Sequence, residues 1–233
     1  MLKTVALVTQ TAWLEIDSWV AANMEKKRSS GLLLLDMSAA FNLVPKEILI
    51  PKLIQLGLSE EAAKLIESYM TGRKNACKIQ DKVSDFKEVR TGIGEGSVLG
   101  PLVFLVCIIE TSMIAELVKE ELQRICPRAH LDVDLSTVNF ADDTTVLVSA
   151  SSDTNLETAM NVSSDEFFKY FKVKGMKMNK MKEEHITFMA RVATKELPNG
   201  INVNCRKEAQ TVKLLGVNVS QGYTFVNHCT VAG

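Results

Sequence analysis

Two adjacent aspartates lie inside an otherwise apolar, β-branched run, in the stretch VNFADDTTVLVSA at residues 138–150. Strand-forming residues flank the pair on both sides, which predicts an antiparallel hairpin whose turn is ADD. Aspartate favours turns because its side chain bonds the nearby backbone, so a plain turn residue is the simplest interpretation of either one alone. Two carboxylates in a poorly hydrated hairpin repel each other, and they require a compensating charge.

A divalent cation would provide this charge, because Mg²⁺ is held by one or two carboxylates together with phosphate oxygens. Asp142 and Asp143 supply two carboxylates. Asp36 supplies a third, near the end of LLLLDM (residues 32–37), a short apolar run with the pattern of a buried strand. Three carboxylates at neighbouring strand ends indicate a two-metal site for phosphoryl transfer.

Composition excludes a uniformly basic nucleic-acid binder, because 27 Lys and Arg residues face 28 Asp and Glu residues. A local basic patch stays compatible with this balance. The five cysteines have no metal-binding spacing, which favours reduced thiols in an intracellular protein. The apolar run at 98–109 is too short to span a membrane, and the N-terminus lacks a signal-peptide pattern. We therefore expect a nuclear or cytoplasmic protein that is not secreted and has no membrane partner.

Periodicity predicts helices at roughly 4–26, 46–57, 59–72, 98–123 and 154–173, with Ser59 as an N-cap. Alternation predicts a hairpin over 76–92 with its turn near Asp81, and later strands at 185–190 and 212–219. Strands and helices mix without a strict alternation. The pattern favours an α+β fold over a doubly wound parallel sheet.

Five segments, in order, resemble the motifs of the reverse transcriptase domain of non-LTR (LINE-like) retrotransposons. LLLLDMSAAFN (32–42), TGIGEGSVLGPLVFL (91–105) and FADDT (140–144) resemble its first three palm motifs. GMKMNKMKEEHITF (175–188) is similar to the fourth, and VKLLGVNVSQGYTFVNHC (212–229) to the segment that leads into the thumb. The resemblance covers roughly residues 30–229, and the order of DMSAAF, GSVLGP and ADDT makes it specific.

The resemblance implies a right-hand polymerase palm, an antiparallel sheet with helices packed on one face, together with partial fingers. It divides the chain into an N-terminal helical segment (1–30), the palm with partial fingers (31–216) and the start of a truncated thumb connection (217–233). The missing fingers, thumb and endonuclease segments would belong to a longer polyprotein.

The resemblance also assigns the catalytic residues. Two ions, Mg²⁺ or Mn²⁺, would be held by Asp36, Asp142, Asp143 and the carbonyl of Met37, and Lys182 would stabilise the departing pyrophosphate. Around the nucleotide the family places Ala40, Phe41, Glu95, Gly96 and Ser97. Phe41 would exclude a 2′-hydroxyl, with core packing as its alternative, and Gly96 and Ser97 also fit a tight turn.

The implied partners are an RNA template, a DNA primer and deoxynucleoside triphosphates. A basic run that could hold the template–primer backbone contains Lys174, Lys177 and Lys180. For Lys169 and Lys172, a solvated helix face is the better interpretation. The implied function is RNA-directed DNA polymerisation.

Departures from the family pattern keep an alternative open. Glu95 stands where the family has glutamine and adds negative charge near a triphosphate, Asn42 replaces an aspartate, and Glu183 replaces threonine or serine. The alternative is a catalytically inactive retroelement remnant that retains the palm fold, with or without nucleic-acid binding. A phosphohydrolase would use the same carboxylates but leaves GSVLGP unexplained.

Overall fold

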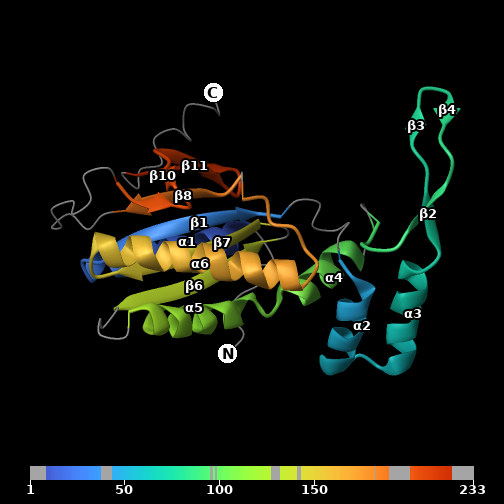
Figure 1. Ribbon diagram of the computed structural model, residues 1–233, viewed down its shortest axis with the longest axis horizontal. Helices are drawn as coiled ribbons and strands as arrows, with labels where there is room; N and C mark the ends of the chain where they lie inside the picture. The colour runs from blue at the N-terminus through green and yellow to red at the C-terminus, as the bar shows by residue number, and fades with distance from the viewer. Residues whose placement is uncertain are drawn as a thin grey trace. The chain divides into compact units, whose positions relative to one another are not determined.

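The computed structural model divides the chain into two compact units (Figure 1). It describes residues 9–37, 44–94, 97, 99–126, 132–140, 143–180, 182–188 and 200–221. The first unit comprises Met1–Asp36, Glu110–Tyr170 and Met178–Gly233, and the second comprises Met37–Ile109 and Phe171–Lys177. The predicted boundaries at residues 30 and 216 separate the subdomains of the family rather than compact units, and they stay a prediction.

A four-stranded antiparallel sheet organises the first unit, in the order β6-β7-β1-β8. Its strands are β1 (Ser29–Asp36), β6 (Val133–Phe140), β7 (Asp143–Ala150) and β8 (Glu184–Phe188). β1 lies between β7 and β8, and its residues Leu32, Leu33 and Leu35 are all buried. A strand covered on both faces needs apolar side chains in both directions, which explains its continuous leucine run.

Helices cover both faces of this sheet. Helix α1 (Thr9–Glu25) buries Ala12, Ile16 and Val20 in the same cluster as Leu32. A Cβ at the neighbouring Gly31 would overlap the Met160 sulfur of α6 (Asp153–Val173). Because successive strand residues point to opposite faces, α1 and α6 lie on opposite sides. The predicted mixture of helices and an antiparallel sheet is present, but its helices are shared between two faces.

Two small hairpins complete the first unit. One pairs β11 (Thr211–Leu214) with β12 (Val217–Ser220) and adds Val212 to the α1-side cluster. The segment predicted as a strand at 212–219 therefore folds back at Leu215 and Gly216, both with positive φ. The other hairpin, which pairs β9 (Asn202–Val203) with β10 (Arg206–Lys207), is not predicted by the sequence pattern.

The predicted helix at 98–123 is wrong in one respect, because it forms two helices. They are α4 (Leu99–Ile108) in the second unit and α5 (Thr111–Ile125) in the first, and the boundary between the units falls in the break. The apolar composition of α4 changes to a charged, amphipathic pattern in α5. By length and composition alone, Leu99–Ile125 could cross a membrane, a test that core helices of soluble proteins also pass.

The second unit contains α2 (Lys46–Gln55), α3 (Glu60–Met70), α4 and a long hairpin. Ser59 is the predicted N-cap of α3, and its hydroxyl accepts from the Ala62 N–H at 3.3 Å. The buried ammonium of Lys52 in α2 donates to the Cys107 carbonyl at the end of α4 at 3.1 Å. The hairpin pairs β2 (Arg73–Asn75) with β5 (Lys87–Val89) and β3 (Lys78–Ile79) with β4 (Lys82–Val83), so the predicted turn near Asp81 is confirmed.

Candidate active site

Asp143, predicted as part of an ADD turn, instead begins β7, where it pairs with Phe140 of β6 and lies opposite the aspartate of the leucine strand. Asp36 is the last residue of β1 and pairs in register with Asp143, the first residue of β7. Directly opposed residues in an antiparallel pair have Cβ atoms about 5 Å apart. The predicted convergence of Asp36 and Asp143 is therefore present. Asp142, the third predicted carboxylate, lies outside the described residues.

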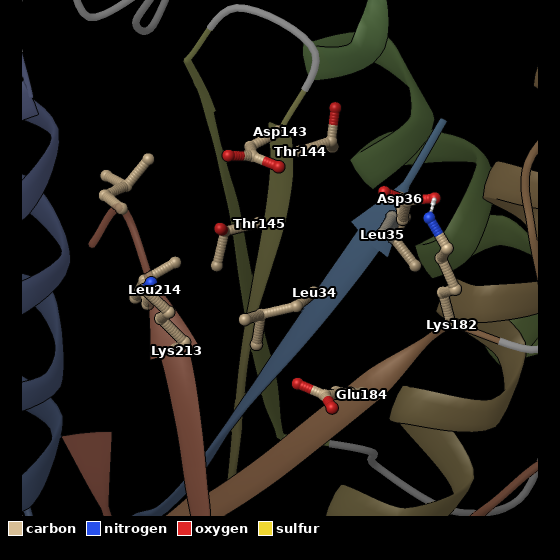
Figure 2. A pocket seen from close by; sticks show the side chains of 11 residues that line it. Leu34, Leu35, Asp36, Asp143, Thr144, Thr145, Lys182, Glu184, Lys213 and Leu214 are labelled. Carbon is tan, nitrogen blue, oxygen red and sulfur yellow. Dashed lines mark ion pairs between the residues drawn. The ribbon is translucent and has the colours of Figure 1, made fainter. Parts of the chain in front are cut away.

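Both aspartates line a pocket of 430 Å³ at this end of the sheet (Figure 2). The pocket is built from β1, β7, β8 and β11, so segments far apart in the sequence meet there. Besides Asp36 and Asp143, its charged lining residues are Lys182, Glu184 and Lys213. Figure 2 shows the two lysines on different sides of the strand ends, with the carboxylates between them.

Lys182 reaches the site through a short turn that is fastened to the end of β1. The Asn179 N–H donates to the Asp36 carbonyl at 2.9 Å, and the Lys182 N–H donates to the Asn179 carbonyl at 2.9 Å. The Lys182 Nζ then lies 3.5 Å from the Asp36 Oδ2, with 65% of the lysine side chain exposed. The predicted placement of Lys182 beside the carboxylates is therefore present in the structure.

The Asp36 Oδ2 atom is buried, although the Asp36 side chain is 38% exposed. Within the described part of the chain it accepts no hydrogen bond. Its neighbouring positive charge is the Lys182 ammonium, at a distance longer than a good charge-assisted hydrogen bond. A buried carboxylate oxygen in this state can accept a cation that the protein itself does not supply.

A buried polar bridge supports the hairpin from the face opposite the aspartates. The Asn139 Nδ2 donates to the Thr111 Oγ1 of α5 at 2.8 Å, and the Thr144 hydroxyl donates to the Asn139 Oδ1 at 3.1 Å. All three side chains are buried. This bridge joins β6, β7 and α5 directly beneath the start of β7, and it fixes the position of Asp143.

The remaining predicted site residues are distributed differently. Met37 and Ser97 belong to the second unit, where Met37 is buried and the Ser97 hydroxyl accepts from the Gly100 N–H at 3.0 Å, at the start of α4. That contact fits the tight-turn alternative for Ser97. The predicted nucleotide-binding residues outside the described part of the chain are Ala40, Phe41, Glu95 and Gly96.

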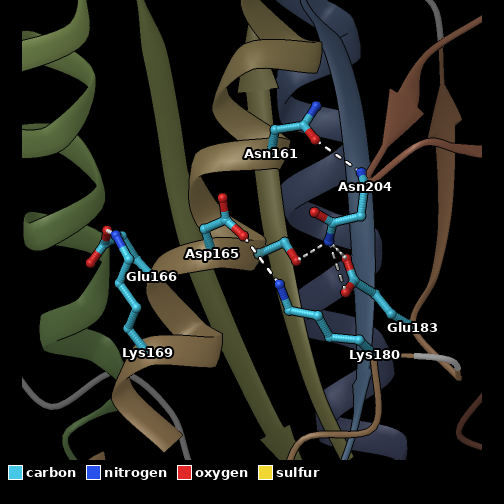
Figure 3. Close-up of polar contacts among 8 residues, drawn as sticks. Asn161, Asp165, Glu166, Lys169, Lys180, Glu183 and Asn204 are labelled. Atoms are coloured by element: carbon cyan, nitrogen blue, oxygen red, sulfur yellow. Dashed lines mark hydrogen bonds and ion pairs between the residues drawn. The ribbon is translucent and has the colours of Figure 1, made fainter. Parts of the chain in front are cut away.

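The predicted nucleic-acid lysines are divided between the two units, and their role stays a prediction. Lys180 pairs with Asp165 at 3.2 Å (Figure 3). Its ammonium also lies over the Phe168 ring, 4.2 Å from the ring centroid. Lys174 and Lys177 belong to the second unit. Lys169 pairs with Glu166 at 2.6 Å on the exposed side of α6, and this hydrogen bond raises the Lys169 pKa. The alternative of a solvated face therefore fits Lys169.

Glu183, one of the departures from the family pattern, has an internal structural role. It is 5% exposed, and its carboxylate accepts from the Asn204 Nδ2 at 3.2 and 3.3 Å (Figure 3). The same amide group donates to the Ser164 hydroxyl of α6 at 2.7 Å. Glu183 therefore fastens the segment that follows Lys182 to the β9–β10 turn.

Sequence reasoning missed Glu184 and Lys213 as pocket residues. The exposed, buried, exposed, buried pattern along β11 indicates that Lys213 points away from the core. Nothing in the sequence indicates that β11 lies beside the end of β1. Among the described residues, no group of three or more His, Cys, Asp or Glu side chains is arranged to hold a metal. The predicted set of three includes Asp142, which is outside them.

Comparison with known proteins agrees with the motif order. The family described as reverse transcriptase (RNA-dependent DNA polymerase) matches residues 4–219. The chain belongs to the reverse transcriptase family. It is 28% identical over 209 residues to the RNA-directed DNA polymerase from mobile element jockey of Drosophila funebris, and 26% identical over 210 residues to that of Drosophila melanogaster.

These jockey polymerases come from a non-LTR, LINE-like element, so the predicted resemblance to non-LTR reverse transcriptases is confirmed. Each alignment covers 89% of this chain and 21% of the relative. The chain therefore spans about a fifth of the length of these curated reverse transcriptases.

Solved structures show the same fold at low identity. The apo telomerase from Candida tropicalis, truncated from its C-terminal domain, has a TM-score of 0.54 at 15% identity, covering 93% of this chain and 39% of that one. The Candida albicans telomerase, in complex with a TWJ fragment of telomeric RNA, has a TM-score of 0.56 at 13% identity, covering 93% and 34%. The predicted α+β, palm-like class is confirmed for this reverse transcriptase domain.

Proposed function

We propose that this chain catalyses RNA-directed DNA synthesis as the palm of a non-LTR retrotransposon polymerase, joining a deoxynucleotide to a primer 3′-hydroxyl. The observation that carries the proposal is the pairing of Asp36 with Asp143 in a pocket that also contains Lys182. Family membership and the jockey relatives support the same reaction. Nuclear or cytoplasmic location, and the subdomain limits at residues 30 and 216, belong to the same proposal.

The donor set fits divalent cations. Opposed carboxylates, and a buried oxygen that accepts no hydrogen bond from the described residues, match the all-oxygen ligands that Mg²⁺ and Mn²⁺ prefer. We assign two ions to Asp36, Asp142 and Asp143, with the Met37 carbonyl as a further ligand. When bound, such ions activate the primer hydroxyl and neutralise the charge on the departing pyrophosphate.

The chain's own cations act on the phosphates. Lys182 can donate a proton or a hydrogen bond to a phosphate oxygen once it no longer faces Asp36, because its exposed stem lets the ammonium turn into the pocket. Lys213 attracts the same anions from its own side of the pocket. Glu184 adds a third carboxylate to the same pocket.

RNA is the proposed template. The jockey relatives are named RNA-directed polymerases, and one structural neighbour is a telomerase in complex with an RNA fragment. A DNA primer and deoxynucleoside triphosphates complete the reaction. Phe41 remains the proposed residue for sugar selection, and Ala40, Glu95, Gly96 and Ser97 the proposed surroundings of the nucleotide.

Primer extension tests this function. The chain is mixed with poly(rA)/oligo(dT), dTTP and Mg²⁺ or Mn²⁺, and extended products are separated on a gel. We expect extension by the native protein and at least a hundredfold loss in Asp36→Asn and Asp143→Asn, because each variant removes a charged ligand. Asp134→Asn is the matched control, since Asp134 is an exposed carboxylate on the same sheet.

The inactive-remnant alternative predicts a different result. Extension would be absent from the native chain while the fold is retained, and Asp143→Asn would change nothing measurable in the assay. Extension that persists in both aspartate variants would contradict the assignment of the site.

A further inference from the structure

The hairpin at residues 73–90, which we call the basic hairpin, exposes large apolar side chains. Ile79, Val83 and Phe86 are 74%, 59% and 70% exposed. Among the described residues no third strand pairs with either half of the hairpin. Figure 1 shows it extending from the end of α3 as a narrow ribbon. Isolated two-stranded ribbons are marginally stable in water, so uncovered apolar side chains here indicate a surface that a partner contacts.

The charge of the basic hairpin identifies the kind of partner. It contains six Lys and Arg residues against three Asp and Glu residues, a net charge of +3 in a chain whose net charge is −1. Arg73 is used internally, because its guanidinium donates to the Thr91 carbonyl at 3.1 Å and to the Gly92 carbonyl. The exposed lysines without an ion pair in the described structure are Lys74, Lys78, Lys82 and Lys87.

Strand register keeps Lys78 and Lys82 from being neutralised across the ribbon, whereas Lys74 lies opposite Glu88. Lys78 lies opposite Val83, and Lys82 lies opposite Ile79. Each ammonium therefore extends past an aliphatic neighbour into solvent. Lys180, from the basic run near residues 174–182, differs because its ammonium already pairs with the Asp165 carboxylate and lies over the Phe168 ring.

A hollow of 640 Å³ lies where the two halves of the hairpin meet. Its lining combines the ammonium groups of Lys74 and Lys87 with the carboxylate of Asp85 and the hydrogen-bonding side chains of Asn75 and Ser84. Two hydrogen bonds join the two halves of the hairpin at this hollow. The Ser84 N–H donates to the Cys77 carbonyl at 2.9 Å, and the Cys77 N–H donates to the Ser84 hydroxyl at 3.0 Å. The Lys74 and Lys87 ammonium groups in this lining can contact a phosphate.

We propose that the basic hairpin binds a single strand of nucleic acid, with Lys78, Lys82 and Lys87 on phosphates and Phe86 stacked on an unpaired base. A duplex hides its base faces, whereas a single strand offers them to an exposed aromatic ring. This inference rests on the proposed function for its occupant, the unpaired part of the RNA template. It gives the hairpin a binding role separate from the aspartate pocket.

The test measures anisotropy of a fluorescein-labelled, unstructured 20-nucleotide RNA at several salt concentrations. The variant is Lys78→Gln/Lys82→Gln/Lys87→Gln. The control is Lys26→Gln/Lys64→Gln/Lys207→Gln, which removes the same charge from exposed lysines elsewhere. Three lost phosphate contacts should lower the slope of log K against log salt by about 2. We expect that change in the hairpin variant and little change in the control.

Phe86→Ala separates stacking from charge. It should weaken single-strand binding by roughly five- to a hundredfold, with an unchanged salt slope and a smaller effect on a blunt duplex. Circular dichroism and thermal melting check that each variant keeps its fold. A labelled DNA strand of the same sequence shows whether the hairpin distinguishes RNA from DNA.

Two results would overturn the inference. One is RNA binding by the hairpin variant with native affinity and salt slope, which would leave a protein partner as the occupant. The other is an equal loss in the control, which would reduce the effect to net charge. Primer extension is scored in a separate assay. RNA binding through the hairpin without primer extension refutes only the proposed function. Primer extension together with native RNA affinity in both hairpin variants refutes only this inference.

Discussion

At the scale of single residues, the negative charge of Asp36 is only partly balanced by a neighbouring lysine. Its Oδ2 is buried, and its positive neighbour is an ammonium held at 3.5 Å by a largely exposed side chain. Exposed ion pairs of this kind contribute about 0–1 kcal/mol to stability. Lys182 is therefore a weak counter-ion that a divalent cation at Asp36 can displace.

Lys182→Gln should bind Mn²⁺ more tightly than the native chain. Removing a positive charge a few ångströms away favours the cation by about 1 kcal/mol in a water-exposed setting, or roughly fivefold in affinity. Isothermal titration with Mn²⁺ in the absence of nucleotide measures this directly. Lys213→Gln is the matched control, because Lys213 lines the pocket without pairing with Asp36, and it should show a smaller gain. An equal gain in both variants, or none in Lys182→Gln, would contradict the counter-ion role.

At the scale of elements, the β6–β7 hairpin owes its position to the buried bridge through Asn139. Asn139→Ala leaves the buried hydroxyls of Thr111 and Thr144 without this partner. We expect the free energy of unfolding to fall by roughly 2–3 kcal/mol, because unsatisfied buried polar groups cost about 1–3 kcal/mol each. Urea unfolding followed by circular dichroism measures the change.

Two further variants distinguish a lost bridge from a lost side chain. Ser136→Ala, a half-exposed position on the same strand, should change stability by less than about 0.5 kcal/mol. Adding Thr111→Val and Thr144→Val to Asn139→Ala should restore part of the loss, because both hydroxyls that lost the Asn139 partner are then removed. A triple variant that is less stable than Asn139→Ala would argue for packing alone.

At the scale of the whole molecule, His185 couples stability to pH. It is 2% exposed on β8, and burial lowers its pKa below the ordinary value of 6.5, while the Ile201 carbonyl, Glu208 and Glu183 act in the opposite direction. The unfolded chain therefore binds a proton at a higher pH than the folded chain. The contribution of neutral His185 to the free energy of unfolding is fully present above about pH 6.5, and it decreases as pH falls toward the folded pKa.

His185→Gln should flatten this dependence. Glutamine stays neutral, and its amide can still donate to the Ile201 carbonyl that the His185 Nε2 faces at 3.2 Å. Urea midpoints at pH 7.5, 6.5 and 5.5 compare the two proteins. The native sequence should lose more stability than the variant between pH 6.5 and 5.5, because only its unfolded state has an imidazole at this position that takes up a proton. Parallel pH profiles would show that other groups control acid stability.

The sequence by itself determined the local elements and their chemistry. The leucine strand, the ADD hairpin, the Ser59 cap and the turn near Asp81 follow from alternation, side-chain capping and turn preference, which act over a few residues. Ordered motifs were specific enough to identify the reverse transcriptase family and to predict that Asp36 and Asp143 meet.

Tertiary structure decided what depends on packing between distant segments. The break between α4 and α5 coincides with a boundary between compact units, whereas helical periodicity continues across it. Lys182 faces Asp36 because the turn at Asn179 bonds to the end of β1, and Lys213 enters the pocket because β11 lies beside that same strand end. A run of charged residues in the sequence does not show which lysines form ion pairs, because their partners are brought together only by folding. Lys180 forms an ion pair with Asp165, whereas Lys78 and Lys82 of the basic hairpin extend into solvent.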